Sequence, residues 1–120
     1  MEHEVRVTDL ALLYKDCPFI RDAKVGRTEA DGLMIREGKR CYIEVDNSGK
    51  MGVKQMTAKW KRYEGVDGFI LVVALTERRM QRLLKGATLV KDVALFTTFE
   101  RLYSGMPEPW IDWYGTTTAI

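Results

Sequence analysis

The apolar run GFILVVAL, residues 68–75, is the feature that most constrains the fold. Its apolar residues do not alternate with polar ones, as they would in a strand with one face in water. A helix that crosses a membrane needs about 20 apolar residues, so the run is too short for one. It therefore predicts a strand in a parallel or mixed sheet that other elements cover on both faces.

Three segments have the apolar periodicity of helices. They cover residues 3–15, 53–64 and 77–85. Pro18 cannot continue the first helix, and Thr76 is a residue type that often N-caps a helix such as the third. We expect one more short helix over 99–103, begun by a capping box of Thr97 and Glu100.

Strand-like stretches fill most of the remaining chain. They cover residues 20–27, 30–36, 40–46 and 93–98. The Gly-containing stretch EGK at 37–39 is typical of a hairpin connection. A hairpin followed by strand-helix-strand crossovers predicts an α/β fold with a central mixed β-sheet flanked by helices. The length of 120 residues is within the range of one domain, and we expect a single domain over 1–120.

Composition and charge exclude few functions. The net charge of +2 is too small to indicate a partner. Cys17 and Cys41 lack metal-site spacing and are interpreted as reduced thiols. The N-terminal residues show no apolar signal-peptide segment. We therefore expect a cytoplasmic protein with no membrane association and no small-molecule cofactor.

The stretch EADGLMIREGKRCYIEVD, residues 29–46, carries three carboxylates of interest. Side chains alternate along a strand, so Glu44 and Asp46 share one face at about 6 to 7 Å, and Asp31 reaches the same end if its strand pairs with theirs. Such carboxylates repel unless protons or a cation neutralise them. Mg²⁺ or Mn²⁺ binds one or two carboxylates together with waters and phosphates. The alternative is that Glu44 and Asp46 are solvated charges on an edge strand, or that they pair with Lys39 and Arg40.

The order of the predicted elements resembles the restriction-endonuclease-like core (α-β-β-β-α-β) of the PD-(D/E)xK nuclease superfamily. An Asp-Gly pair opens the second strand, and Glu-x-Asp closes the third. Two positions depart from the superfamily's pattern. Ala30 stands where the pattern has Pro, and Asp46 stands where it has Lys.

A closer resemblance covers His3 to about Trp110. The segments HEVRVTDL, ADGLMI, YIEVDNSG, KWKRY, ILVVALTERRMQRLL and ALFTTFERL are similar, in order and spacing, to the C-terminal domain of the plasmid replication-relaxation proteins. In that family a winged-helix DNA-binding segment precedes this domain. We expect no such segment here, because only Met1 and Glu2 precede His3, and the chain is then either a trimmed domain or a compact stand-alone relative.

The resemblance implies a metal-dependent catalytic site. Asp31 and Glu44 are the expected ligands of Mg²⁺ or Mn²⁺, with Asp46 as an extra ligand and the Val45 carbonyl as a further one. Lys59 matches the helix lysine of the family, and we expect it to supply the positive charge that Asp46 cannot.

Two further residues are candidates for the same site. Gln55 lies one helical turn before Lys59 and is a candidate for orienting a water or a phosphate. His3 is a candidate for a group that reaches the carboxylates. Each role has a plainer alternative: a core histidine for His3, a solvated lysine for Lys59, and a turn residue for Asp31.

Basic and aromatic side chains suggest partners. The candidate nucleic-acid-binding residues are Lys50, Lys54, Lys61 and Arg62, and Arg78, Arg79 and Arg82 extend the same basic rim. Trp60 is expected in the core. Trp110 and Trp113 in the tail either wrap the core or cover a homodimer contact.

The resemblance implies a DNA-processing domain that hydrolyses phosphodiesters with a divalent metal, linked to plasmid or phage DNA replication or relaxation. The alternative is a non-catalytic nuclease-fold module for DNA binding, dimerisation or nucleoprotein assembly. Asp46 supports that alternative, because it replaces the cation of the superfamily's third strand.

Overall fold

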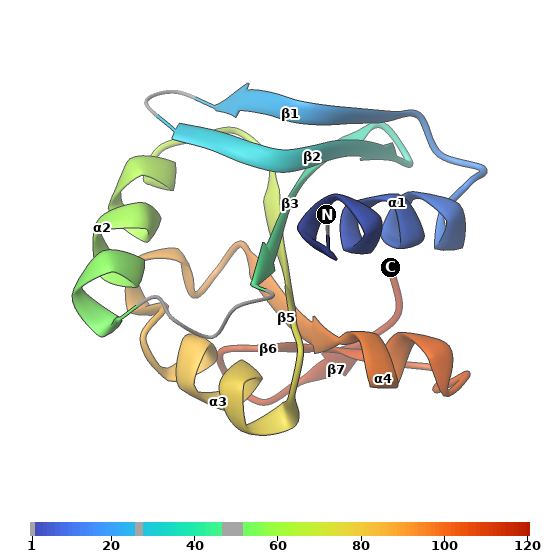
Figure 1. Cartoon of the computed structure of the whole chain (residues 1–120). Coiled ribbons are helices and arrows are strands. Elements are labelled where there is room, and N and C mark those ends of the chain that lie inside the picture. Colours follow the sequence, from blue (N-terminus) through green and yellow to red (C-terminus); the bar gives the residue numbers. More distant parts are fainter. Residues whose placement is uncertain (1, 26–27, 47–51) are drawn as a thin grey trace.

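A seven-stranded sheet forms the centre of the computed structural model (Figure 1). The structure describes residues 2–25, 28–46 and 52–120, with the backbone alone for residues 2–6 and 53. The strands are β1 (Phe19–Val25), β2 (Thr28–Arg36), β3 (Lys39–Asp46), β4 (Phe69–Ala74), β5 (Ala94–Thr98), β6 (Trp110–Asp112) and β7 (Thr117–Thr118). They lie side by side in chain order.

The sheet is mixed, as the sequence predicts. β1, β2 and β3 pair antiparallel, β3, β4 and β5 pair parallel, and β6 and β7 are added antiparallel. The two parallel connections are made by helices that cross over the sheet, as parallel strands require. The predicted α/β fold with a central mixed sheet is therefore confirmed.

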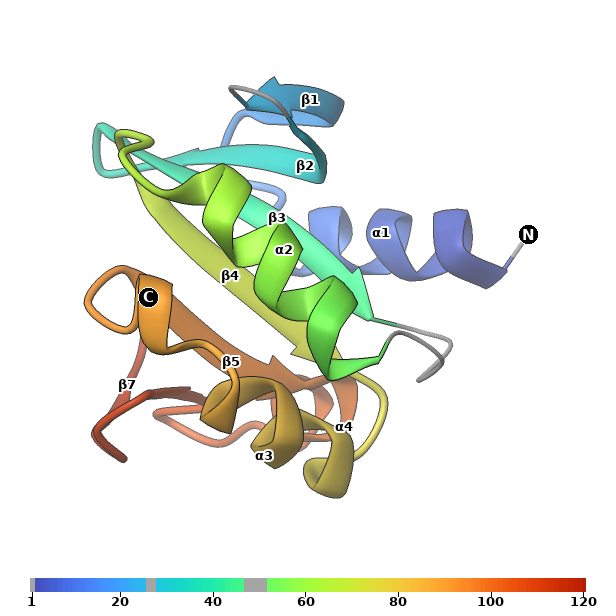
Figure 2. The same ribbon diagram turned by 90° about the vertical axis from the view of Figure 1, so that its left-hand side faces the viewer.

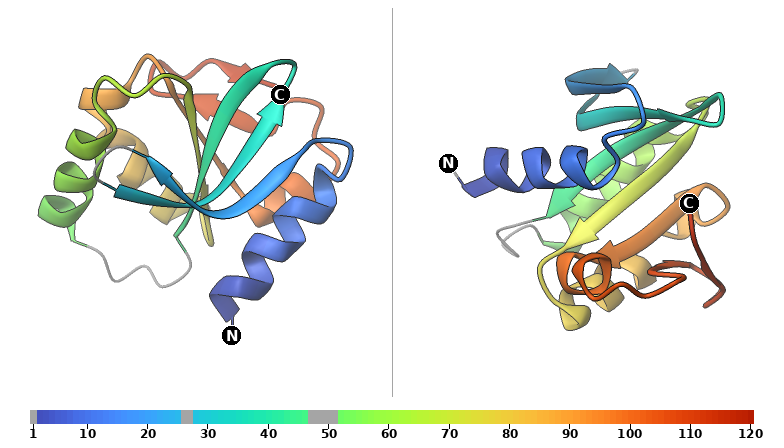
Figure 3. Two further views of the ribbon diagram at one scale, coloured as in Figure 1. Left: turned by 90° about the horizontal axis from the view of Figure 1, so that it is seen from above. Right: turned by 90° about the vertical axis from the view of Figure 1, so that its right-hand side faces the viewer.

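Helices cover both faces of the sheet. They are α1 (Glu2–Leu13), α2 (Val53–Tyr63), α3 (Glu77–Lys85) and α4 (Phe99–Tyr103), with a 3₁₀ turn, η1, at Thr88–Val90. α2 and α3 lie over one face (Figure 2), and α1 and α4 lie over the other (Figure 3). Among the described residues, no helix is both long and apolar enough to cross a lipid bilayer.

The run 68–75 forms β4, and both of its faces are buried. Ile70, Val72 and Ala74 belong to the core beneath α2 and α3, whereas Leu71 and Val73 belong to the core beneath α1 and α4. This double burial accounts for the lack of alternation in the sequence. The prediction made from this run is confirmed.

The connection between β2 and β3 is a two-residue turn. Glu37 and Gly38 have φ angles of 53° and 77°, and Arg36 pairs with Lys39 across the turn. Two left-handed residues in a row define the type I′ turn, whose twist matches that of the flanking strands. The predicted hairpin is therefore present, one residue shorter in its loop than EGK.

The C-terminal segment differs most from the predictions. The N-cap of α4 is Thr98, whose Oγ1 accepts a hydrogen bond from the Arg101 amide at 3.1 Å. The predicted cap at Thr97 is wrong, because its hydroxyl donates to the Pro109 carbonyl at 2.7 Å. The tail then adds β6 and β7, which the sequence did not predict.

Tryptophans pack in the two cores. Trp60 and Trp110 are fully buried, and the Trp110 indole donates to the Tyr14 hydroxyl at 3.1 Å. The core position predicted for Trp60 is confirmed. For the tail, the alternative in which Trp110 wraps the core is confirmed, and Trp110 has no exposed surface for a homodimer contact. Trp113 is partly buried against the core beneath α2.

Candidate functional site

Glu44 lies at the centre of the site, near the carboxyl end of β3. Only 6% of its side chain is exposed, and both carboxylate oxygens contact polar groups. Lys59 Nζ lies 2.8 Å from Oε1, and the Tyr63 hydroxyl donates to Oε2. Burial raises the pKa of the Glu44 carboxyl, while Lys59 and Tyr63 oppose that rise. The predicted alternative of a solvated edge charge is wrong, because β3 lies between β2 and β4.

Both partners of Glu44 come from α2. Met56 and Trp60 bury one side of this helix against the sheet, which fixes its rotation. Lys59 and Tyr63 are four residues apart and therefore share a neighbouring side of the helix. The Lys59 side chain is 23% exposed, so its ammonium group lies between the buried carboxylate and solvent. The plainer reading of Lys59 as a fully solvated lysine is wrong.

Asp31 joins the same end of the sheet from β2. Its Oδ2 accepts a hydrogen bond from the Val45 amide at 2.7 Å. Gly32 pairs with Ile43, so the antiparallel register places Asp31 opposite Glu44, and the negative charge of Asp31 adds to the rise in the Glu44 pKa. Asp31 lies inside a strand, and the alternative of a turn residue is wrong.

The glycine that follows Asp31 has a packing role. A Cβ atom at Gly32 would lie 2.6 Å from Cζ of Phe19, well inside contact distance. Phe19 begins β1 and packs against the core beneath α1. The Asp-Gly pair therefore combines a polar group for the site with close packing between β1 and β2.

Asp46 is turned toward α3. Arg79 Nε lies 2.6 Å from its Oδ2, and Nη2 lies 3.3 Å from its Oδ1. The two side chains are 13% and 11% exposed, for Arg79 and Asp46 respectively. The partners expected from the sequence, Lys39 and Arg40, are wrong for both carboxylates of β3, because α2 and α3 supply the cations instead.

The other candidate residues lie around this centre or outside the described side chains. Gln55 is exposed, and its Oε1 accepts from the Gly52 amide at 3.0 Å, which satisfies a backbone donor at the start of α2. Lys54, Lys61 and Arg62 are exposed on α2. The side chain of His3 and the whole of Lys50 lie outside the described part of the chain.

Sequence reasoning missed the contributions of Tyr63 and Arg79. Helical periodicity places Tyr63 on the apolar face of its helix, whereas its four-residue spacing from Lys59 is the signal that places it beside the site. Arg79 was assigned to a basic rim. A cation in the first turn of a helix is disfavoured by the helix dipole, and this was a sign that a carboxylate faces it.

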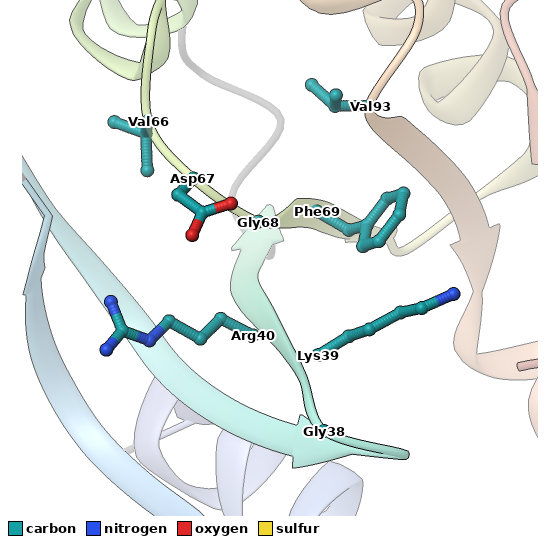
Figure 4. A pocket seen from close by; sticks show the side chains of 8 residues that line it. All are labelled: Gly38, Lys39, Arg40, Val66, Asp67, Gly68, Phe69 and Val93. Carbon is teal, nitrogen blue, oxygen red and sulfur yellow. The ribbon is translucent and has the colours of Figure 1, made fainter.

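A separate cavity lies at the opposite end of the parallel strands (Figure 4). Its volume is about 500 Å³, and its lining includes Lys39, Arg40, Asp67 and Phe69. Arg40 and Glu44 are four residues apart on β3, which corresponds to roughly 13 Å. The cavity is therefore distinct from the carboxylate site.

The chain matches no protein-family model, no curated protein and no solved structure. The case for a function therefore rests on the chemistry of Asp31, Glu44, Lys59 and their neighbours.

Proposed function

We propose that this protein is a divalent-metal-dependent DNA-processing domain with a PD-(D/E)xK-type nuclease fold, linked to plasmid or phage DNA replication or relaxation. The order α1, β1, β2, β3, α2 and β4 agrees with the α-β-β-β-α-β core of that superfamily. The observation that carries the proposal is the contact between Lys59 and Glu44, beside Asp31. Lys59 supplies, from α2, the positive charge that the superfamily's pattern places at the position of Asp46 on β3.

The donor chemistry fits a hard divalent cation. Asp31 and Glu44 supply carboxylates from neighbouring strands, and one or two carboxylates with waters and phosphates suffice for Mg²⁺ or Mn²⁺. Among the described residues, no three acidic, histidine or cysteine side chains gather into a group, so phosphate and water would complete the coordination. A bound ion would polarise the scissile phosphate and lower the pKa of an attacking water.

The protein's own residues have three roles in this proposal. Asp31 and Glu44 hold negative charge at one point of the sheet. Lys59 places an ammonium group next to them, where it is able to offset the charge that develops on a phosphate during hydrolysis. Tyr63 fixes the Glu44 carboxylate by donating to Oε2, which limits the orientations of the carboxylate.

DNA is the proposed substrate, and exposed cations flank the site. Lys54, Lys61 and Arg62 on α2 carry positive charge on the helix that presents Lys59. Cations of this kind bind phosphates without reading the base sequence. Lys50 is a further candidate residue of this interface, and Gln55 and His3 are candidate residues of the catalytic site.

The test is cleavage of supercoiled, nicked and branched DNA with Mg²⁺ or Mn²⁺. Wild-type protein is expected to cleave at least one substrate, and Asp31→Ala and Glu44→Gln are expected to reduce the rate at least about 100-fold. Lys85→Met serves as the control, because Lys85 is an exposed cation at the end of α3 and lies outside the proposed site. An absence of cleavage by the wild type, or equal rates in the Asp31→Ala variant, contradicts the proposal.

A second candidate function is a non-catalytic module for DNA binding, dimerisation or nucleoprotein assembly. It is favoured by one observation: both Glu44 oxygens and both Asp46 oxygens contact protein groups. Carboxylates used in this way stabilise the fold without a metal. This function predicts no rise in melting temperature with Mn²⁺, whereas a metal that binds the native state raises it.

A further inference from the structure

The ion pair between Asp46 and Arg79 lies next to the proposed catalytic site. Asp46 is two residues after Glu44 on β3, and side chains at that spacing share a face about 6 to 7 Å apart. Arg79 contacts Asp46 directly, so its guanidinium group lies close enough to Glu44 to meet a phosphate that neighbours the scissile one in the DNA strand.

Arg79 is held at both ends of the residue. Its backbone amide donates to Thr76 Oγ1 at 3.1 Å, which caps α3, and its guanidinium group binds Asp46 through two nitrogens. The side chain is 13% exposed, so the pair lies at the border between core and solvent. A guanidinium group at such a border is positioned in advance and binds phosphate with the same geometry as carboxylate.

We propose that Arg79 binds a DNA phosphate beside the scissile position, and that Asp46 acts as an internal competitor for it. This inference rests on the proposed function, because the ligand is the same DNA. The Asp46 carboxylate takes the place of a phosphate when DNA is absent. A DNA strand that reaches Glu44 brings a phosphate to the same guanidinium group, while the Asp46 charge repels that phosphate.

This role predicts opposite effects from the two halves of one ion pair. Asp46→Asn removes the negative charge that competes with a phosphate for the Arg79 guanidinium group, so DNA affinity rises. Arg79→Gln removes the phosphate contact and leaves Asp46 unopposed, so DNA affinity falls. A pair that only attaches α3 to β3 alters DNA affinity through net charge alone, by no more than a single charge change at an exposed position does.

The experiment is fluorescence anisotropy with a labelled DNA duplex and the full chain, in EDTA, from about 50 to 200 mM salt. Arg79→Gln is expected to weaken binding about 10-fold and to reduce the salt slope by about 1. Asp46→Asn is expected to tighten binding at least about threefold. Lys85→Gln, at the far end of the same helix, removes an equal charge and serves as control for net charge.

Arg79→Lys is a more conservative variant for the case in which Arg79→Gln does not fold. It keeps the positive charge and is expected to keep the salt slope. Thermal denaturation of each variant identifies those that remain folded. Equal affinities for Asp46→Asn and Arg79→Gln, a salt slope unchanged in Arg79→Gln, or no DNA binding by the wild type overturns the inference. Cleavage that depends on Asp31, together with unchanged binding in these variants, overturns the role of Arg79 and leaves the proposed function standing.

Discussion

Lys59 Nζ lies 2.8 Å from Oε1 of Glu44, so an ammonium group on α2 meets a buried carboxylate on β3. The contact attaches α2 to the sheet at the position where Asp31 on β2 lies opposite Glu44. Removal of either partner leaves a charge with little solvent around it, and such a charge is costly.

Lys59→Met is expected to lower the free energy of unfolding by about 2 kcal/mol at pH 7, because Glu44 loses its cation while it stays buried. The exposed Lys54→Met is the control on the same helix, with an expected change within about 0.5 kcal/mol. Urea denaturation of both variants measures the difference. Equal stability of the two variants would show that the contact with Glu44 contributes nothing.

Tyr63→Phe is expected to destabilise the protein by about 1.5 to 3 kcal/mol, since the lost hydrogen bond goes to a carboxylate. Tyr42→Phe is the matched control. The two rings are 6.2 Å apart, and the Tyr42 hydroxyl makes no hydrogen bond to a side chain or backbone group in the described segments. A Tyr63→Phe protein as stable as Tyr42→Phe contradicts this account of Glu44.

Stability is expected to depend on pH through Glu44. Burial raises its pKa in the folded state, so between about pH 4.3, the ordinary glutamate value, and that raised pKa the folded protein binds more protons than the unfolded chain. The contribution of Glu44 to stability therefore falls as pH rises through this window. We therefore expect wild type to lose stability relative to Glu44→Gln as pH rises, when the unfolding free energies of both are measured at several pH values. A gain in the stability of wild type relative to Glu44→Gln with rising pH would contradict this prediction.

The two buried tryptophans are expected to respond differently to the same substitution. Trp110 donates to Tyr14, whereas the Trp60 indole nitrogen has no hydrogen-bond partner in the described part of the structure. Trp110→Phe should therefore cost about 1 kcal/mol more than Trp60→Phe, because it alone breaks a hydrogen bond. Chemical denaturation of the two variants measures this, and an equal or reversed order contradicts the assignment.

Local patterns in the sequence predict most of the fold. The unalternating run of β4 and the helical periodicity of α2 and α3 each follow from burial of one defined set of side chains. The short strands β6 and β7 carry too few residues to show any period. The predicted N-cap of α4 is one residue too early. Thr97 and Thr98 are both suitable N-cap residues, and the hydrogen bond from Thr97 to distant Pro109 decides between them.

The site was predictable in part. Alternation along β3 and its pairing with β2 bring Asp31 and Glu44 to one end of the sheet. The partners of Glu44 and Asp46 were not predictable from alternation, because Lys59 and Arg79 come from helices 15 and 33 residues away in the chain. Local spacing identifies the face of a helix that is buried, but it does not identify the strand that the helix covers.

The most direct measurement of the central claim is anomalous diffraction from a crystal soaked in Mn²⁺. The account predicts a peak about 2 Å from carboxylate oxygens of both Asp31 and Glu44, which is lost in a crystal of Asp31→Asn. A crystal in which no peak lies between these residues, and Glu44 keeps its contacts with Lys59 and Tyr63, would contradict the account.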